Sequence, residues 1–176
     1  IDLLVERNDV NILLVGGPDD VEIAENLLKV VLRKDAVASM AAETSLADLP
    51  GLLKNCVLYV GNDSGPKHVA AAVGIPTIGI HSGVVDPMEW GPVGPTAVAL
   101  RRNMSCSPCY LANAADCPRS LACLKFLEPS LVYEAADMML RQGVRPNPMV
   151  SVSRQARKAK VGRRLSVTEQ SITEPA

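Results

Sequence analysis

Short apolar runs alternate along this chain with stretches in which apolar residues recur at helical spacing. The runs have the length of buried strands, and Gly16-Gly17-Pro18 closes the first of them. We expect strands at residues 12–15, 36–40, 57–60, 76–80 and 97–100. Strands that alternate with helices form parallel sheets covered on both faces. The pattern therefore predicts an α/β fold built on a Rossmann-like parallel sheet.

The segments between these strands read as helices. We expect helices after residue 20 and over residues 46–55, 66–73 and 131–141. Asp19 or Asp20 can cap the first helix. The Pro50-Gly51 pair interrupts the second, and Gly74 suits the C-terminal end of the third. These helices are the expected covering layers of the sheet.

Length and charge indicate the domain organisation. The 176 residues are enough for one domain with its own core, and the aromatic content of 3% means that Ala, Val, Leu and Ile must build it. We expect this domain at residues 1–145. Residues 151–176 hold six basic and two acidic residues, so residues 146–176 read as a disordered basic tail, with contact to nucleic acid or anionic lipid as the alternative.

The sequence also indicates a location. No apolar run approaches the ~20 residues of a membrane span, and no signal-peptide pattern is present. We therefore expect a cytoplasmic protein, and the net charge of −1 does not favour a nucleic-acid partner. The chain begins with Ile1, and its first residues read as the end of a helix that leads into a strand. We expect a domain whose upstream part is missing.

The loop "GNDSGPKH" holds the strongest candidate chemistry. It follows the third strand, and ligands of such sheets bind beyond the carboxyl ends of the strands. Free amides at the start of the following helix, together with the helix dipole, suit an anion and most naturally a phosphate. The amides expected to face it are those of Ser64, Gly65, Lys67 and His68. The alternative is an ordinary strand-to-helix turn capped by Ser64.

The next strand leads into a second candidate loop. His81 lies at its mouth and is the other histidine of the chain, which favours a site at these adjacent loops. Asp86, Glu89 and Trp90 follow in "HSGVVDPMEWGPVGP". They could hold a sugar or a base, or they could fold the loop on itself.

Four cysteines form a C-x2-C-x7-C-x5-C pattern inside residues 104–124. They are Cys106, Cys109, Cys117 and Cys123. In a cytoplasmic protein this clustering suggests a metal before disulfides, and four thiolates make a closed tetrahedral zinc site. An iron–sulfur cluster, free thiols and disulfides are the alternatives. Cys56 lies apart and reads as a small buried residue.

The segment "GNDSGPKHVAAAVGIPTIGI" followed by "DPMEWGP" resembles the C-terminal domains of glycosyltransferase family 9, the heptosyltransferase-like enzymes of lipopolysaccharide assembly. The resemblance covers about residues 11–141. It implies half of a GT-B fold that binds a nucleotide diphosphate sugar. Ser64, Gly65 and Lys67 would hold the diphosphate, with Asp63 and His68 near the donor sugar and phosphates. The full expected donor set is Asn62, Asp63, Ser64, Gly65, Lys67, His68, His81 and Gly83.

The resemblance also implies an activity and its limits. The enzyme would be an inverting glycosyltransferase that uses an ADP-, UDP- or GDP-linked sugar, with heptose indicated by the family, and a glycan or lipid-linked acceptor. It would need no cofactor for transfer, and we expect the enzyme in the cytoplasm, with the inner face of the membrane as one location there. The catalytic carboxylate base lies in an N-terminal acceptor domain that this chain lacks, so we expect the chain alone to be inactive.

One turn departs from the family pattern. Where members carry an aromatic-Gly-x-[ST] turn after the fourth strand, this chain reads His81-Ser82-Gly83-Val84. The first strand of the C-terminal domain is absent as well. The alternative to an enzyme is a non-catalytic nucleotide-binding or metal-stapled module of a larger protein.

Overall fold

The computed structural model describes residues 1–142. Its strands are β1 (Ile12–Leu14), β2 (Val37–Ser39), β3 (Tyr59–Asn62), β4 (Thr77–Ile80) and β5 (Ala97–Leu100). Its α-helices are α1 (Asp2–Asn8), α2 (Val21–Val30), α3 (Leu49–Leu53), α4 (Gly65–Ala72), α5 (Pro87–Trp90), α6 (Ala122–Lys125) and α7 (Pro129–Arg141). Short 3-10 helices are η1 (Pro18–Asp20), η2 (Lys34–Ala36) and η3 (Ala114–Asp116). The expected tail, residues 146–176, lies outside the described residues.

All strand pairs are parallel, as the alternation of strands and helices predicts. They form two sheets, β1-β2 and β3-β4-β5, rather than the single expected sheet. Within residues 1–142, β1 and β3 do not pair with each other. In the doubly wound order 3-2-1-4-5-6, the first strand separates the second from the fourth. The break therefore falls at the position that the first strand takes in that order.

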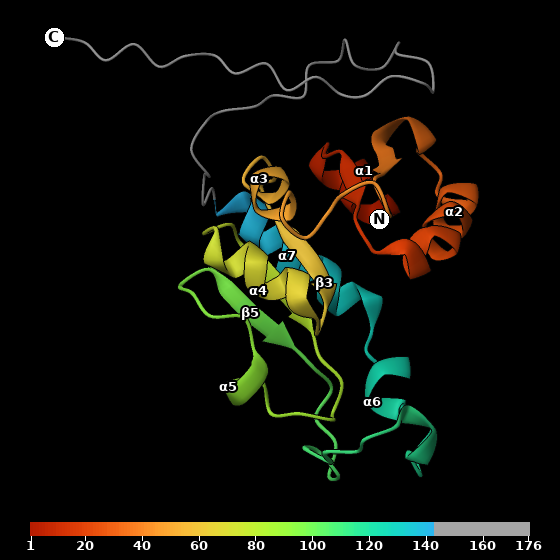
Figure 1. The fold of residues 1–176 in the computed structure, drawn as a ribbon, viewed down its shortest axis with the longest axis vertical. Helices are drawn as coiled ribbons and strands as arrows, with labels where there is room; N and C mark the ends of the chain where they lie inside the picture. The colour runs from red at the N-terminus through yellow and green to blue at the C-terminus, as the bar shows by residue number, and fades with distance from the viewer. Residues whose placement is uncertain (143–176) are drawn as a thin grey trace, which may run out of the picture.

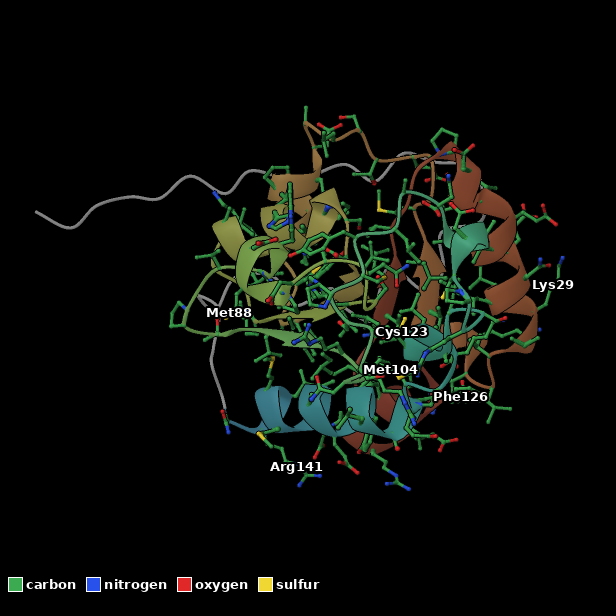
Figure 2. The ribbon with its side chains drawn as sticks, turned by 90° about the horizontal axis from the view of Figure 1, so that it is seen from below. Lys29, Met88, Met104, Cys123, Phe126 and Arg141 are labelled. Carbon is green, nitrogen blue, oxygen red and sulfur yellow. The ribbon has the colours of Figure 1, made fainter. Side chains whose placement is uncertain are left out.

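The three-stranded sheet is covered on both faces. Thr77 and Ile78 are both fully buried, and successive residues of a strand point to opposite faces. Figures 1 and 2 show α4 on one side of this sheet and α7 on the other. A strand buried in this way needs apolar or hydrogen-bonded side chains on both faces, and the Thr77 hydroxyl donates to the Ile75 carbonyl at 2.9 Å.

Two apolar clusters build the core. The larger one joins α3, β3 and α4 through Leu49, Leu53, Tyr59, Ala70 and Ile75. Ala70 is fully buried, so its small side chain lets α4 lie close to the sheet. The second cluster joins α1, α2 and β2 through Val5, Val31, Ala36 and Val37.

The N-terminal helix α1 connects the second apolar cluster to α7, the helix that covers one face of the three-stranded sheet. Helix α1 packs against α7, where the Asn8 amide donates to Asp137 at 2.6 Å and the Arg7 guanidinium lies 5.6 Å from the centre of the Tyr133 ring. The described residues contain no helix that is both long and apolar enough to cross a membrane.

The C-terminal end of α4 and the start of α3 can be compared with the bounds that the sequence predicts. Gly74 follows α4 with a φ of 83°, which confirms its role in ending that helix. The expected helix at residues 46–55 is shorter, because α3 begins at Leu49. Pro50 therefore lies in its first turn, where a missing N–H costs nothing, and does not interrupt it.

Candidate functional site

The loop between β3 and α4 lies at the carboxyl edge of the three-stranded sheet. β3 ends at Asn62, and Ser64 precedes α4 with extended backbone angles. The Asp63 amide donates to the Ile80 carbonyl at 3.0 Å, which ties this loop to the end of β4. His81 follows β4, and its backbone amide donates to the Leu100 carbonyl at 2.8 Å. The two predicted loop mouths are therefore neighbours.

The exposed part of this loop forms a surface that we call the helix-start face. It consists of Asn62, Ser64, Gly65 and His68, which are all exposed, and of the half-buried Asp63. Two expected donors are absent from it. The Lys67 amide bonds to the Ser64 carbonyl at 3.2 Å, and the His68 amide makes the first intrahelical bond of α4, to the same carbonyl. The positive end of the α4 helix dipole still points toward this face.

The Lys67 side chain turns inward rather than toward a ligand. Its exposed fraction is 0%, and its ammonium group donates to Asp63 Oδ1 and to the carbonyl oxygen of Trp90. The same ammonium lies 3.3 Å from His81 Nε2. A buried charge needs an opposite charge and a full set of hydrogen bonds, and these three acceptors provide both. The expected contact of this side chain with a diphosphate is therefore not formed here.

Gly79 makes room for this arrangement. A Cβ atom at position 79 would lie 2.8 Å from Lys67 Cδ and 3.1 Å from His81 Nε2. Both distances are shorter than ordinary van der Waals contact. The sequence patterns did not single out Gly79. The four-residue spacing of Asp63 and Lys67, which suits an ion pair on a helix, is the signal that could have revealed the inward lysine.

His81 is fully buried and neutral in this network. An ammonium group can only donate, so Nε2 accepts from Lys67 and the ring proton lies on Nδ1. Nδ1 lies 3.2 Å from Asp63 Oδ2, close enough for attraction but off the line of a hydrogen bond. Burial lowers the pKa of His81, and the nearby Asp63 carboxylate opposes that shift.

This pKa shift predicts a pH dependence of stability. The unfolded chain takes up the His81 proton near pH 6.5, whereas the folded chain does so only at lower pH. The contribution of neutral His81 to the free energy of unfolding is therefore complete above pH 6.5. It is lost as the pH falls toward the pKa of the folded state, and the free energy of unfolding then changes by at most about 1.4 kcal/mol per pH unit. Urea unfolding from pH 7.5 to 5 measures it. The slope should shrink in His81→Gln and persist in His68→Gln; an unchanged slope in His81→Gln contradicts the assignment.

Of the three side chains expected in the second loop, Asp86 folds the loop on itself, which is one of the two expectations for it. Asp86 Oδ1 accepts from the Met88 amide at 3.0 Å and so caps α5. Glu89 accepts from the Tyr110 hydroxyl at 3.2 Å. The Trp90 side chain remains 57% exposed, although its carbonyl is held by Lys67.

The cysteine-rich segment packs against the turn that follows β4. The Cys109 amide donates to the Gly83 carbonyl at 3.0 Å, and the Tyr110 amide donates to the Val84 carbonyl at 2.8 Å. Gly83 is buried, and a Cβ on it would lie 3.2 Å from Ser107 Cβ. Gly83 therefore packs against the cysteine-rich segment and does not belong to the helix-start face.

The four clustered cysteines line one small pocket beside this turn. Cys106, Cys109, Cys117 and Cys123 share it with apolar residues that include Met104. Figure 2 shows Met104 and Cys123 close together. All the cysteines are free, and a hydrogen bond from the Leu121 amide at 3.3 Å lowers the pKa of the Cys117 thiol. Cys56 is half-buried against the larger core cluster.

Zinc at these thiols stays a prediction. Within residues 1–142, no three or more His, Cys, Asp or Glu side chains are arranged to hold a metal ion. If the four thiolates close around zinc, protein purified under reducing conditions should carry about one zinc per chain by mass spectrometry. Cys117→Ser should lose the metal and Cys56→Ser should keep it. Metal-free protein with four reactive thiols in this segment would contradict the prediction.

Comparisons with known proteins give the family and the fold of this chain. Residues 1–116 match the family model of glycosyltransferase family 9 (heptosyltransferase). Lipopolysaccharide heptosyltransferase 3 of Escherichia coli K12 is 33% identical over 94 residues, which cover 52% of this chain and 26% of that protein. Lipooligosaccharide heptosyltransferase 2 of Campylobacter jejuni is 25% identical over 138 residues, which cover 74% of this chain and 41% of that protein. This chain thus spans less than half of these relatives.

Two solved structures share the fold. A family 9 glycosyl transferase from Veillonella parvula aligns with a TM-score of 0.65 at 24% identity, covering 80% of this chain and 39% of that one. The E. coli ADP-heptose lipopolysaccharide heptosyltransferase II aligns with a TM-score of 0.61 at 24% identity, covering 75% of this chain and 37% of that one. They confirm the predicted α/β fold class, with parallel sheets flanked by helices. With the family match over residues 1–116, the chain belongs to glycosyltransferase family 9, the heptosyltransferase family.

Proposed function

We propose that this chain is the donor-binding part of an inverting glycosyltransferase. The enzyme moves a sugar, heptose first among the candidates, from a nucleotide diphosphate sugar to a glycan or lipopolysaccharide acceptor. The observation that carries the proposal is the helix-start face: four exposed residues surround a half-buried carboxylate at the start of α4. This face lies at the carboxyl edge of a parallel sheet, where ligands of such folds bind.

The chemistry of this face fits a diphosphate. Backbone amides at the start of a helix and its positive dipole end attract phosphate oxygens. His68 is exposed beside them and can donate a hydrogen bond to the same oxygens. Negative charge develops on the leaving nucleoside diphosphate as the bond to the sugar breaks. Donors already in place for that charge would favour the transition state over the bound substrate.

Asp63 is suited to the sugar rather than to the phosphates. Its carboxylate keeps 24% of its side-chain surface exposed, and an exposed carboxylate accepts hydrogen bonds from sugar hydroxyls. We propose ADP-heptose as the first donor to test, because the E. coli relative of known structure is an ADP-heptose enzyme. UDP- and GDP-linked sugars are the alternatives, since all of them present the same diphosphate.

We propose that the rest of the reaction depends on residues outside this chain. The chain spans 26% and 41% of the two curated relatives, so the catalytic base and the acceptor site are proposed to lie in the remainder of the enzyme. We propose no cofactor for transfer. The enzyme would work in the cytoplasm, at the inner face of the membrane where a lipid-linked acceptor lies.

Calorimetric titration of the chain with ADP, UDP and GDP tests the proposal. We expect one diphosphate to bind best and His68→Ala to weaken it by roughly tenfold, the effect of losing one hydrogen bond to a charged group. His68 is exposed, so this variant should keep its melting temperature. The exposed Lys54→Ala is the matched control. Absence of binding to a folded chain would leave an ordinary turn and favour the non-catalytic module.

A further inference from the structure

We propose that Lys67 is a positioning residue that couples Asp63, on the helix-start face, to the segment that carries Trp90. We call the group of Lys67, Asp63, His81 and the Trp90 carbonyl the lysine network. It adds to the proposed function a role for a residue that cannot touch a donor from its buried position. Its main test needs no ligand.

Each of the three partners of Lys67 comes from a different part of the chain. Asp63 precedes α4, His81 follows β4, and Trp90 ends α5. An ammonium group has three N–H donors, and each finds one acceptor here. The hydrogen-bonding capacity of Lys67 is thereby used up inside the protein. One side chain thus holds three loops together at the carboxyl edge of the sheet.

Only one of the three side chains in the lysine network reaches the surface. Lys67 and His81 have exposed fractions of 0%, whereas Asp63 keeps 24% of its side chain exposed. A ligand hydroxyl that donates to Asp63 therefore draws on the same carboxylate charge that Lys67 binds through Oδ1. Any change in the Asp63–Lys67 bond reaches the main chain of Trp90, because Lys67 also holds its carbonyl.

The segment that Lys67 holds can respond as a unit. Within α5 and its end, the Trp90 amide bonds to the Asp86 carbonyl at 3.1 Å and the Gly91 amide bonds to the Pro87 carbonyl at 2.7 Å. These local bonds keep the turn intact while its attachment changes. Trp90 and Met88 are largely exposed on it, so the lysine network positions an apolar surface beside the helix-start face. Lys67 would thus link the state of Asp63 to the placement of that surface.

The test uses the only tryptophan of the chain. In Lys67→Met, acrylamide quenching of Trp90 fluorescence should rise by about twofold, because the segment loses its attachment to α4. The exposed Lys54→Met is the matched control and should quench like the wild type. Asp63→Asn should also change the quenching, but only when Lys67 is present. In the Lys67→Met background, Asp63→Asn should add nothing, because contacting residues in one network act non-additively.

Two outcomes would overturn the inference. One is wild-type quenching in a folded Lys67→Met variant, and the other is an equal effect of Asp63→Asn in both backgrounds. If Lys67→Met does not fold, NMR of the wild type decides instead. A through-hydrogen-bond coupling between Lys67 15Nζ and the Trp90 13C′ carbonyl is expected, and ammonium protons in fast exchange without that coupling contradict it.

The donor proposal fails independently of this one. If ADP, UDP and GDP do not bind by calorimetry, the proposed function falls while the ligand-free quenching result stands. If ADP does bind, it should shift Trp90 emission in the wild type and leave it unchanged in Lys67→Met. A shift of equal size in both proteins would show that the signal reaches Trp90 without Lys67.

Discussion

Asp63→Asn should lower the free energy of unfolding by about 3 kcal/mol, the lower end of the cost of breaking a buried ion pair. The reason is that Lys67 stays buried and charged with no opposite charge beside it. The partial exposure of Asp63 keeps the expected value at the lower end. Urea unfolding at neutral pH, followed by circular dichroism, measures the change.

The reverse substitution separates the charge from the packing. Lys67→Met leaves a carboxylate that can turn toward water, so its expected cost is only about 1–2 kcal/mol, from hydrogen-bond acceptors left without a donor. In that background, Asp63→Asn should cost less than about 1 kcal/mol, because no buried charge remains to be stranded. Equal costs of Asp63→Asn in both backgrounds would show that the Lys67 charge does not depend on Asp63.

The second large effect is expected at Gly61. A Cβ at this position would lie 2.6 Å from Tyr59 Cζ and 2.8 Å from Tyr59 Cε1, and the ring is held in the larger core cluster. A rigid buried ring cannot yield as a flexible side chain does. Gly61→Ala should therefore lower the free energy of unfolding by about 2–3 kcal/mol, as overpacked core substitutions do. The loss is measured by urea unfolding.

Two further variants make the Gly61 result specific. In a Tyr59→Leu background the ring is gone, so Gly61→Ala should cost less than about 1 kcal/mol. Gly51→Ala is the matched control: a Cβ there meets nothing within 4 Å, and a helical Gly-to-Ala change should stabilise by about 0.5–1 kcal/mol. A full cost of Gly61→Ala without the ring would point to the backbone rather than to Tyr59.

Local sequence patterns predicted the strands well where an apolar run coincides with residues whose backbone pairs with a neighbouring strand. The strand at residues 97–100 was predicted with the bounds that β5 has, and β4 differs by one residue. β3 begins and ends two residues later than expected, because its ladder with β4 starts at Tyr59 and continues through Asn62. Backbone pairing extends a strand beyond its apolar side chains, and a pattern of side chains does not record that.

The candidate site also has some features that the sequence predicts and others that it does not. The loop between β3 and α4, its exposed residues and its position at the sheet edge follow from the order of strand, Gly-rich loop and helix in the sequence. The placement of the histidine after β4 beside this loop follows from parallel topology. These features are local or topological, so one sequence is enough to predict them.

Tertiary packing decided the rest. A lysine four residues after an aspartate can extend into water or turn inward, and local sequence favours neither. Lys67 turns inward because Gly79 leaves room for its stem, while His81 and the Trp90 carbonyl supply acceptors from 14 and 23 residues away. Tertiary packing also decided the role of Gly83, because the cysteine-rich segment that covers it lies more than 20 residues downstream. Sequence determined which groups are near the site, and contacts between distant segments determined which of them face a ligand.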